Sequence, residues 1–197
     1  MNSFLEADTL TEKQIIAYTS AWVEHVVIGL NLCPFAKPVH TKGQIDYFLS
    51  HARDETTLAA DLRLAMQRLI ASTPEKMDTC LLIHPWVLSD FFDYNNFLDI
   101  ADGILDELEL IGVLQIASFH PHYQFAGTTE DDVTNCTNRS PFPMLHLLRE
   151  KSLDKATAAL PDANVIVDRN VDTMISLGHE GWNHLQSQLK QSIKSTS

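Results

Sequence analysis

The chain has 197 residues, 45% of them hydrophobic, and its 14 basic and 26 acidic side chains give a net charge of −12 at neutral pH. This length suits one domain with one core, and seven glycines and eight prolines are too few for a collagen-like or low-complexity chain. The negative charge disfavours a nucleic-acid partner, because it repels the phosphate backbone.

The acidic residues are concentrated in the middle of the chain. Residues 77–138 contain eleven Asp and Glu but no Lys or Arg. One interpretation is a solvated acidic face that aids solubility. The other is a surface that attracts a cation or a basic partner.

The chain has no features of export or membrane insertion. Residues 1–6 lack the basic and apolar regions of a signal peptide, and no run approaches the roughly 18 apolar residues of a membrane span. Its three cysteines are widely spaced and include no CxxC pair, which predicts reduced thiols. We therefore expect a cytoplasmic protein without a membrane partner.

The first predicted elements alternate between helix and strand. Residues 11–14 read as a capping box, and apolar residues then recur at helical spacing until about residue 31, just before Cys33 and Pro34. A loop follows to residue 38. The next predicted elements are a strand over 44–49, a helix with an apolar stripe over 58–69 that ends at 72–74, and a buried strand over 79–83. A helix capped by Ser89 or Asp90, with Gly112 as its C-terminal glycine, and a buried strand over 113–119 follow.

The last third of the chain is predicted to be mostly helical. A polar loop of about twenty residues follows residue 119, and a loop of that length is often functional. Ser140 and Pro141 read as the cap and first position of a helix over 141–150. The remaining predictions are more helix over 151–160, a short strand over 164–167, a last helix over 171–189 with weak points at Gly178 and Gly181, and a frayed tail from 192.

Strands that alternate with helices of this length favour right-handed crossovers and a largely parallel sheet. We therefore expect an α/β fold: a single domain over residues 1–197, with a small, largely parallel or mixed sheet of three to four strands covered by helices. The strands over 79–83 and 113–119 should be adjacent, parallel and buried. No segment reads as a linker between domains.

Several histidines directly follow the predicted strands. His51 follows the first strand, His84 the second, and His120 and His122 the third. Ligands of parallel sheets bind beyond the carboxyl ends of the strands, so these side chains are candidates for one site. His120 and His122 could share a metal ion, with Asp131 or Asp132 as a carboxylate ligand. The alternative is that each imidazole is bonded to backbone or water.

Arg139 ends the stretch without basic residues and lies beside two prolines, Pro141 and Pro143. Such a guanidinium requires a partner. The partner is either a carboxylate of the protein, from residues 130–132, or an anionic ligand. Asn138 is the neighbouring candidate for ligand binding.

His146 and Cys33 have two interpretations each. On a helix, His146 would share a face with Arg149 and either point at the same site or face solvent. Cys33 has apolar neighbours, which indicate a buried, unreactive thiol; as a nucleophile it would need a histidine base. The motifs of P-loops, serine hydrolases, zincins, zinc fingers and EF-hands are absent from the sequence.

Three segments carry a resemblance to a known family. They are residues 29–36 (GLNLCPFA), 119–123 (FHPHY) and 138–150 (NRSPFPMLHLLRE). Together they resemble a family of bacterial proteins, a domain of unknown function of about this length. The resemblance implies a bacterial, cytoplasmic, single-domain protein and assigns no reaction to any residue.

Two hypotheses of function follow. The first is a small-molecule-binding domain or enzyme acting on a small anionic substrate, with His120, His122 and Arg139 as catalytic candidates and Asn138, Arg139, His84 and His146 as ligand-binding candidates. The second is a non-enzymatic adaptor or assembly protein with a partner surface of exposed aromatic residues, Trp86, Phe91 and Phe92. A polar pocket beside His120 would favour the first hypothesis, and a flat apolar patch the second.

Overall fold

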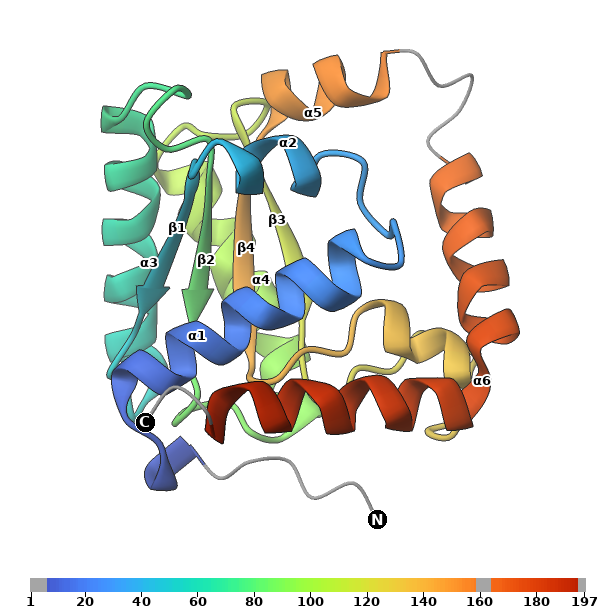
Figure 1. The fold of residues 1–197 in the computed structure, drawn as a ribbon. Helices are drawn as coiled ribbons and strands as arrows, with labels where there is room; N and C mark the ends of the chain where they lie inside the picture. The colour runs from blue at the N-terminus through green and yellow to red at the C-terminus, as the bar shows by residue number, and fades with distance from the viewer. Residues whose placement is uncertain (1–6, 159–163, 195–197) are drawn as a thin grey trace.

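Four strands form one mixed sheet in the order β1-β2-β4-β3 (Figure 1). The structure is a computed structural model that describes residues 7–158 and 164–194. Strands β1 and β2 are parallel, and β4 lies antiparallel between β2 and β3. β1, β2 and β3 therefore point in the same direction. The strand bounds are β1 Ile45–Leu49, β2 Thr79–Ile83, β3 Leu114–Phe119 and β4 Met144–Arg149.

Helices cover both faces of this sheet (Figure 1). On one face lie α3 and α4; on the other lie α1, the π-helix η2, α2 and the carboxyl half of α6. The helix bounds are η1 Ala7–Thr9, α1 Glu12–Trp22, η2 Val23–Ile28, α2 Ala36–Thr41, α3 Glu55–Ala71, α4 Phe91–Glu107, η3 Val133–Thr137, α5 Glu150–Thr157 and α6 Asn164–Lys194.

Alternation along the strands divides the apolar residues between two cores. In β4, Leu145 and Leu147 pack toward α3 and α4, whereas Met144 faces the helices of the opposite side. The same alternation separates Leu82 from Leu81 in β2. Each strand residue points opposite to its neighbours, so a continuous apolar run supplies both cores at once.

Side-chain caps fix the predicted helix starts. Thr11 and Gln14 form the predicted capping box of α1. Asp54 accepts a hydrogen bond from the Thr57 amide at the start of α3, and Asp90 accepts hydrogen bonds from two amides at the start of α4. These contacts satisfy amide donors that have no partner within the helix. The capping box and the cap at Asp90 are therefore confirmed.

The single-domain α/β fold with a mixed sheet is confirmed, but one element was predicted wrongly. Residues 141–150 were expected to be a helix, and they contain strand β4 instead. A strand buried on both faces shows no alternation in its sequence, so periodicity cannot separate it from a buried helix. Because β4 lies between them, β2 and β3 are parallel in direction but not adjacent, which corrects the expected pairing. β2 is buried as expected, but β3 lies at the edge of the sheet and only Leu114 in it is buried, so its expected burial was wrong.

Other differences concern loops and helix ends. Residues 164–167, expected to be a strand, belong to α6, and the expected loop over 31–38 contains the start of α2. The first helix ends in the π-helix η2, beyond which Asn31 has a φ of 54°. The long polar loop contains η3.

Predictions at the chain ends lie mostly outside the described residues. The segment tested for a signal peptide, residues 1–6, is outside them, and so are residues 195–197 of the expected frayed tail; α6 itself ends at Lys194. Among residues 7–158 and 164–194, no helix is long and apolar enough to span a membrane.

Candidate binding site

A cavity of about 690 Å³ lies beyond the carboxyl end of β3, between the following loop and the carboxyl half of α6. Figure 1 shows this half of α6 passing beside η3. The loop contributes His122, Glu130, Asp131, Cys136, Arg139 and Ser140, and α6 contributes His179, Trp182, Asn183 and Gln186. Both sides of the cavity are thus rich in polar groups.

Asn135 holds the loop side in one conformation. Its side chain is fully buried; the amide oxygen accepts hydrogen bonds from the Phe125 amide at 3.0 Å and the Thr128 hydroxyl at 2.9 Å. Its amide nitrogen donates to the Thr129 carbonyl at 2.8 Å. A buried amide with both ends satisfied specifies the path of the surrounding backbone. The long loop is therefore a fixed wall of the cavity.

His120 lies behind this wall and supports it. It is fully buried, its Nε2 lies 3.1 Å from the Leu88 carbonyl, and its Nδ1 lies 3.0 Å from the His122 amide. A carbonyl only accepts and an amide only donates, so Nε2 carries the proton and Nδ1 is the acceptor. Burial lowers the pKa of His120 to about 4. Both ring nitrogens are occupied by protein backbone, so neither is open to a ligand.

His122 is the member of the pair that lines the cavity. Its ring lies 5.9 Å from that of His120, measured between centroids. Because its amide donates to His120, the buried imidazole positions the exposed one. Among the described residues, no group of three or more His, Cys, Asp or Glu is arranged to hold a metal ion.

Arg139 lines the cavity without forming an ion pair. Its Nε donates to the Tyr123 carbonyl at 3.2 Å and its Nη2 to the Glu130 carbonyl at 2.7 Å. Within the described part of the chain, no carboxylate lies within 4.0 Å of the guanidinium. The expected structural partner is thus a pair of backbone carbonyls rather than a carboxylate, and the positive charge is not neutralised.

Cys136 is buried against Arg139 at the base of the loop. Burial raises the pKa of its thiol to about 11, although the charge and hydrogen bond of Arg139 act in the opposite direction. The nucleophilic form of cysteine is the thiolate. At neutral pH, Cys136 is therefore a protonated thiol.

A break in α6 positions the opposite wall. Gly178 has φ 64° and ψ 178°, which interrupts the helix. His179, Trp182, Asn183 and Gln186 then follow at spacings of three, one and three, which places them on one helix face. The charge of His179 contributes to lowering the pKa of Asp132, after the hydrogen bonds from Thr134.

The other predicted site residues lie away from this cavity. Asn138 donates from Nδ2 to the Ser118 carbonyl at 3.1 Å and so joins the loop to β3. His84 is fully buried, with Nδ1 3.2 Å from the Val87 carbonyl. His146 points from β4 into a different cavity, and His51 is exposed near Glu12. Of the residues predicted for the site, the structure brings together His122 and Arg139.

Sequence reasoning missed the whole wall formed by α6. The helix itself was predicted, and Gly178 was recognised as its weak point. The spacing of polar residues after that glycine was the available signal. The local sequence does not indicate which segment of the chain packs opposite a helix face, because that depends on the tertiary fold.

The fold and the site define a class: an α/β domain with a polar cavity beyond the carboxyl end of a mixed sheet. The particular family follows from sequence comparison. A family model described as "Protein of unknown function (DUF1415)" matches residues 14–184, so the chain belongs to this family. No curated protein and no solved structure matches the chain.

Proposed function

We propose that this protein binds a small organic anion, a carboxylate, in the cavity between the loop after β3 and α6. The observation that carries the proposal is Arg139, a half-buried guanidinium that faces the cavity and has no carboxylate of the described chain as its partner. Its planar fork of donors matches a carboxylate. The cavity volume of about 690 Å³ falls within the range typical of small-molecule sites.

The remaining lining restricts the charge of the ligand. Glu130 and Asp131 also face the cavity, and they would repel a multiply charged anion. They would tolerate one carboxylate on Arg139, and they would favour a ligand that also carries an amino group. A monocarboxylate or an amino acid-like zwitterion therefore fits this set of side chains better than a nucleotide.

The cavity also contains groups that could perform proton transfer. Imidazoles are the most frequent general acids and bases in enzymes, and His122 and His179 line the cavity from opposite walls. The protonated Cys136 thiol is not suited to nucleophilic attack. If the protein is an enzyme, acid–base chemistry on the bound carboxylate by these two histidines is the reaction class we propose.

The alternative function, an adaptor with an aromatic partner surface, has less support. Of the three rings considered, Phe92 is 77% exposed. Phe91 packs against Tyr94, His120 and Tyr123 instead, and Trp86 stacks with His51 and lies beneath Arg53. A single exposed ring does not form an interface.

The test is a ligand titration with matched arginine variants. Acetate, lactate, alanine, succinate and inorganic phosphate are titrated by calorimetry, and we expect the singly charged carboxylates or the amino acid to bind. Arg139→Gln should weaken that binding by at least about tenfold, because a charged hydrogen bond is lost. Arg53→Gln, an exposed arginine beside Trp86, should leave it unchanged.

Arg139 also supports the loop, so a second variant separates binding from folding. Gln186 lines the cavity from α6, and Gln186→Leu should weaken ligand binding without changing the thermal midpoint. The proposal is wrong if none of the titrated anions binds at millimolar concentration, or if Arg139→Gln and Gln186→Leu both bind as the natural protein does.

A further inference from the structure

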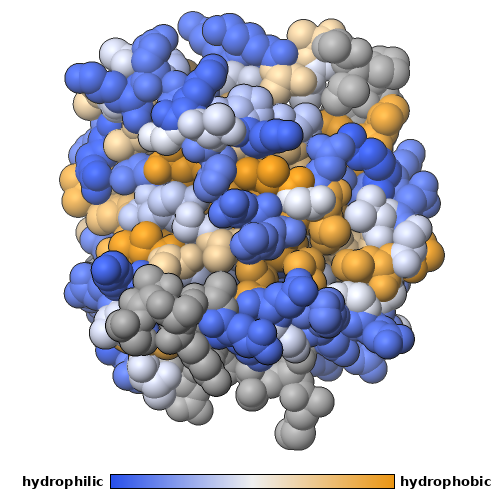
Figure 2. All heavy atoms as spheres, viewed as in Figure 1, coloured by the Kyte–Doolittle hydropathy of each residue, from blue (hydrophilic) through white to orange (hydrophobic). Residues whose placement is uncertain are grey.

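A second, smaller cavity lies between the sheet and the helices α1, η2 and α2. Its volume is about 110 Å³, and it shares no lining residue with the first cavity. The walls are almost entirely apolar; they include Trp22 and Val27 from the helical side and Leu81, Ala117 and Phe119 from the sheet. In Figure 2, hydrophobic surface extends across the middle of this face, in the region between α1 and α2.

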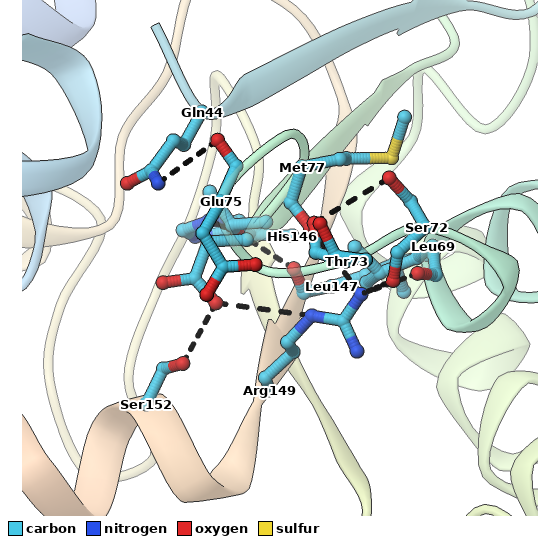
Figure 3. A network of polar contacts seen from close by, with 12 residues as sticks. Gln44, Leu69, Ser72, Thr73, Glu75, Met77, His146, Leu147, Arg149 and Ser152 are labelled. Carbon is cyan, nitrogen blue, oxygen red and sulfur yellow. Dashed lines mark hydrogen bonds and ion pairs between the residues drawn. The ribbon is translucent and has the colours of Figure 1, made fainter. Parts of the chain in front are cut away.

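One imidazole interrupts the apolar lining. His146 projects from the middle of β4, next to Leu147 (Figure 3). Its Nε2 lies 2.6 Å from the Thr79 hydroxyl, which lies 2.6 Å from the Leu147 carbonyl. The hydroxyl has one proton, and the carbonyl can only accept it. Thr79 must therefore donate to Leu147 and accept from His146, so the proton of the neutral ring is on Nε2.

This tautomer leaves Nδ1 as a bare hydrogen-bond acceptor. Burial lowers the pKa of His146 to about 4, so the ring is neutral at physiological pH. No donor to Nδ1 is present among the residues that the structure describes. His146 is half-buried and lines the cavity, so this acceptor, which the described residues leave unpaired, can be reached from the cavity. A cavity beside such an acceptor favours a ligand that supplies the donor.

We infer that this second cavity binds a small neutral molecule with an apolar body and one hydroxyl donor, with phenol or a short-chain alcohol as the matching size. A dry apolar cavity of about 150 Å³ in another protein accepts benzene, so a cavity of about 110 Å³ is in the size range of one small aromatic ring or a short-chain alcohol. The hydroxyl would donate to His146 Nδ1, and the apolar body would lie against Phe119 and Leu81. An anion is excluded, because the walls offer no positive charge.

Cys33 lies between this cavity and a hollow on the surface. It lines the cavity and also a surface hollow of about 510 Å³ formed with Pro34, Lys37 and Pro38. Its side chain is half-buried. A ligand that enters by this route would pass Cys33, so the labelling rate of its thiol can report on occupancy.

The experiment compares phenol with benzene, which has the same ring without the donor. We expect phenol to bind about tenfold more tightly than benzene, the difference of about one hydrogen bond, and to slow the labelling of Cys33. His146→Leu should abolish this preference and leave benzene binding in place. Ala117→Leu should fill the cavity and abolish the binding of both molecules.

Two further variants keep the result unambiguous. If His146→Leu does not fold, Thr79→Val removes the hydroxyl that fixes the tautomer, and the preference for phenol should decrease. Gln186→Leu, in the first cavity, should leave phenol binding unchanged, which separates this inference from the proposed carboxylate site. Equal binding of phenol and benzene by the natural protein, no binding of either, or unchanged phenol binding in Ala117→Leu would each overturn the inference.

Discussion

His120 and His122 are two residues apart and have opposite roles. His120 is fully buried and uses both ring nitrogens on backbone groups, whereas the ring of His122 lines the polar cavity. Arg139 similarly uses its donors on two carbonyls and still presents its charge to the cavity. At the scale of single residues, the environment of a side chain rather than its type decides whether it supports the backbone or lines the cavity.

The cysteines lead to a prediction at this scale. Burial raises the pKa of all three thiols, that of Cys80 to about 12 and that of Cys136 to about 11. We expect Cys33, the half-buried one, to react with a thiol reagent at neutral pH far more slowly than a free thiol does, and the other two to react only after unfolding.

Mass spectrometry of the native protein after timed labelling measures these rates, and the urea-unfolded protein is the control. Labelling of native Cys33 at the rate of the unfolded chain would show that its thiol is exposed and reactive.

At the scale of elements, β4 ties the sheet to α3 through its last residue. Arg149 Nη2 donates to the Ser72 carbonyl at 2.7 Å and to the Met77 carbonyl at 3.3 Å, and it also reaches the Leu69 carbonyl near the end of α3 (Figure 3). Its Nε lies 3.8 Å from Asp78, and both side chains are 13% exposed. The cation thus binds carbonyls at the carboxyl end of α3 and in the connection from α3 to β2.

Arg149→Leu should lower the free energy of unfolding by about 3 kcal/mol, because it leaves the largely buried Asp78 without its counter-charge and the carbonyls without the guanidinium donor. Arg63→Leu is the matched control, since Arg63 and Glu107 form an exposed pair worth less than about 1 kcal/mol. Urea unfolding of both variants measures the difference. A similar small loss in both would contradict the structural role of Arg149.

The break in α6 leads to a second prediction at this scale. Gly178 has a φ of 64°, which an L side chain rarely adopts, so Gly178→Ala should cost about 1–2 kcal/mol. Gly103 lies inside α4, where an added Cβ meets nothing within 4 Å, and Gly103→Ala should stabilise by about 0.5–1 kcal/mol.

Opposite signs for the two substitutions in thermal unfolding are the expected result. Gly178→Ala should also weaken ligand binding in the first cavity, because the break positions His179 and Trp182. A neutral or stabilising Gly178→Ala would show that the helix does not depend on this backbone conformation.

At the scale of the whole molecule, three histidines in different parts of one domain are shielded from water: His84 and His120 are fully buried, and His146 is half-buried. The pKa of His84, of His120 and of His146 is lowered to about 4, first of all by burial. The ordinary value is about 6.5. Between these two values the unfolded chain binds more protons than the folded protein, so acid favours unfolding.

The free energy of unfolding should therefore be fully maintained above about pH 6.5 and should decrease as the pH falls toward 4. The slope for each histidine approaches about 1.4 kcal/mol per pH unit. Urea unfolding at several pH values between 7 and 4.5 measures this decrease in the free energy of unfolding. His51→Gln, at an exposed histidine, should leave the slope unchanged. A free energy of unfolding that is constant over this pH range would contradict the lowered pKa of these three histidines.

Part of this organisation follows from local sequence signals. The capping box at Thr11 and the cap at Asp90 depend only on residues a few positions away, and both were predicted. The apolar runs over 79–83 and 113–119 likewise predicted the strands β2 and β3. β4 was not predicted, because a strand covered on both faces has the same apolar pattern as a buried helix. Its place between β2 and β3 depends on pairing with residues more than sixty positions away in β2.

By itself, the sequence determined an acidic α/β domain of the DUF1415 family, with histidines after its strands and one arginine after a long acidic stretch. The tertiary structure alone decided which of these side chains share a site. His122 and Arg139 meet His179 and Trp182 across a cavity because α6 returns over the loop after the break at Gly178. His84 and His120 are fully buried and His146 lines the other cavity, so none of the three lines this one; their positions depend on how the rest of the chain packs around each ring.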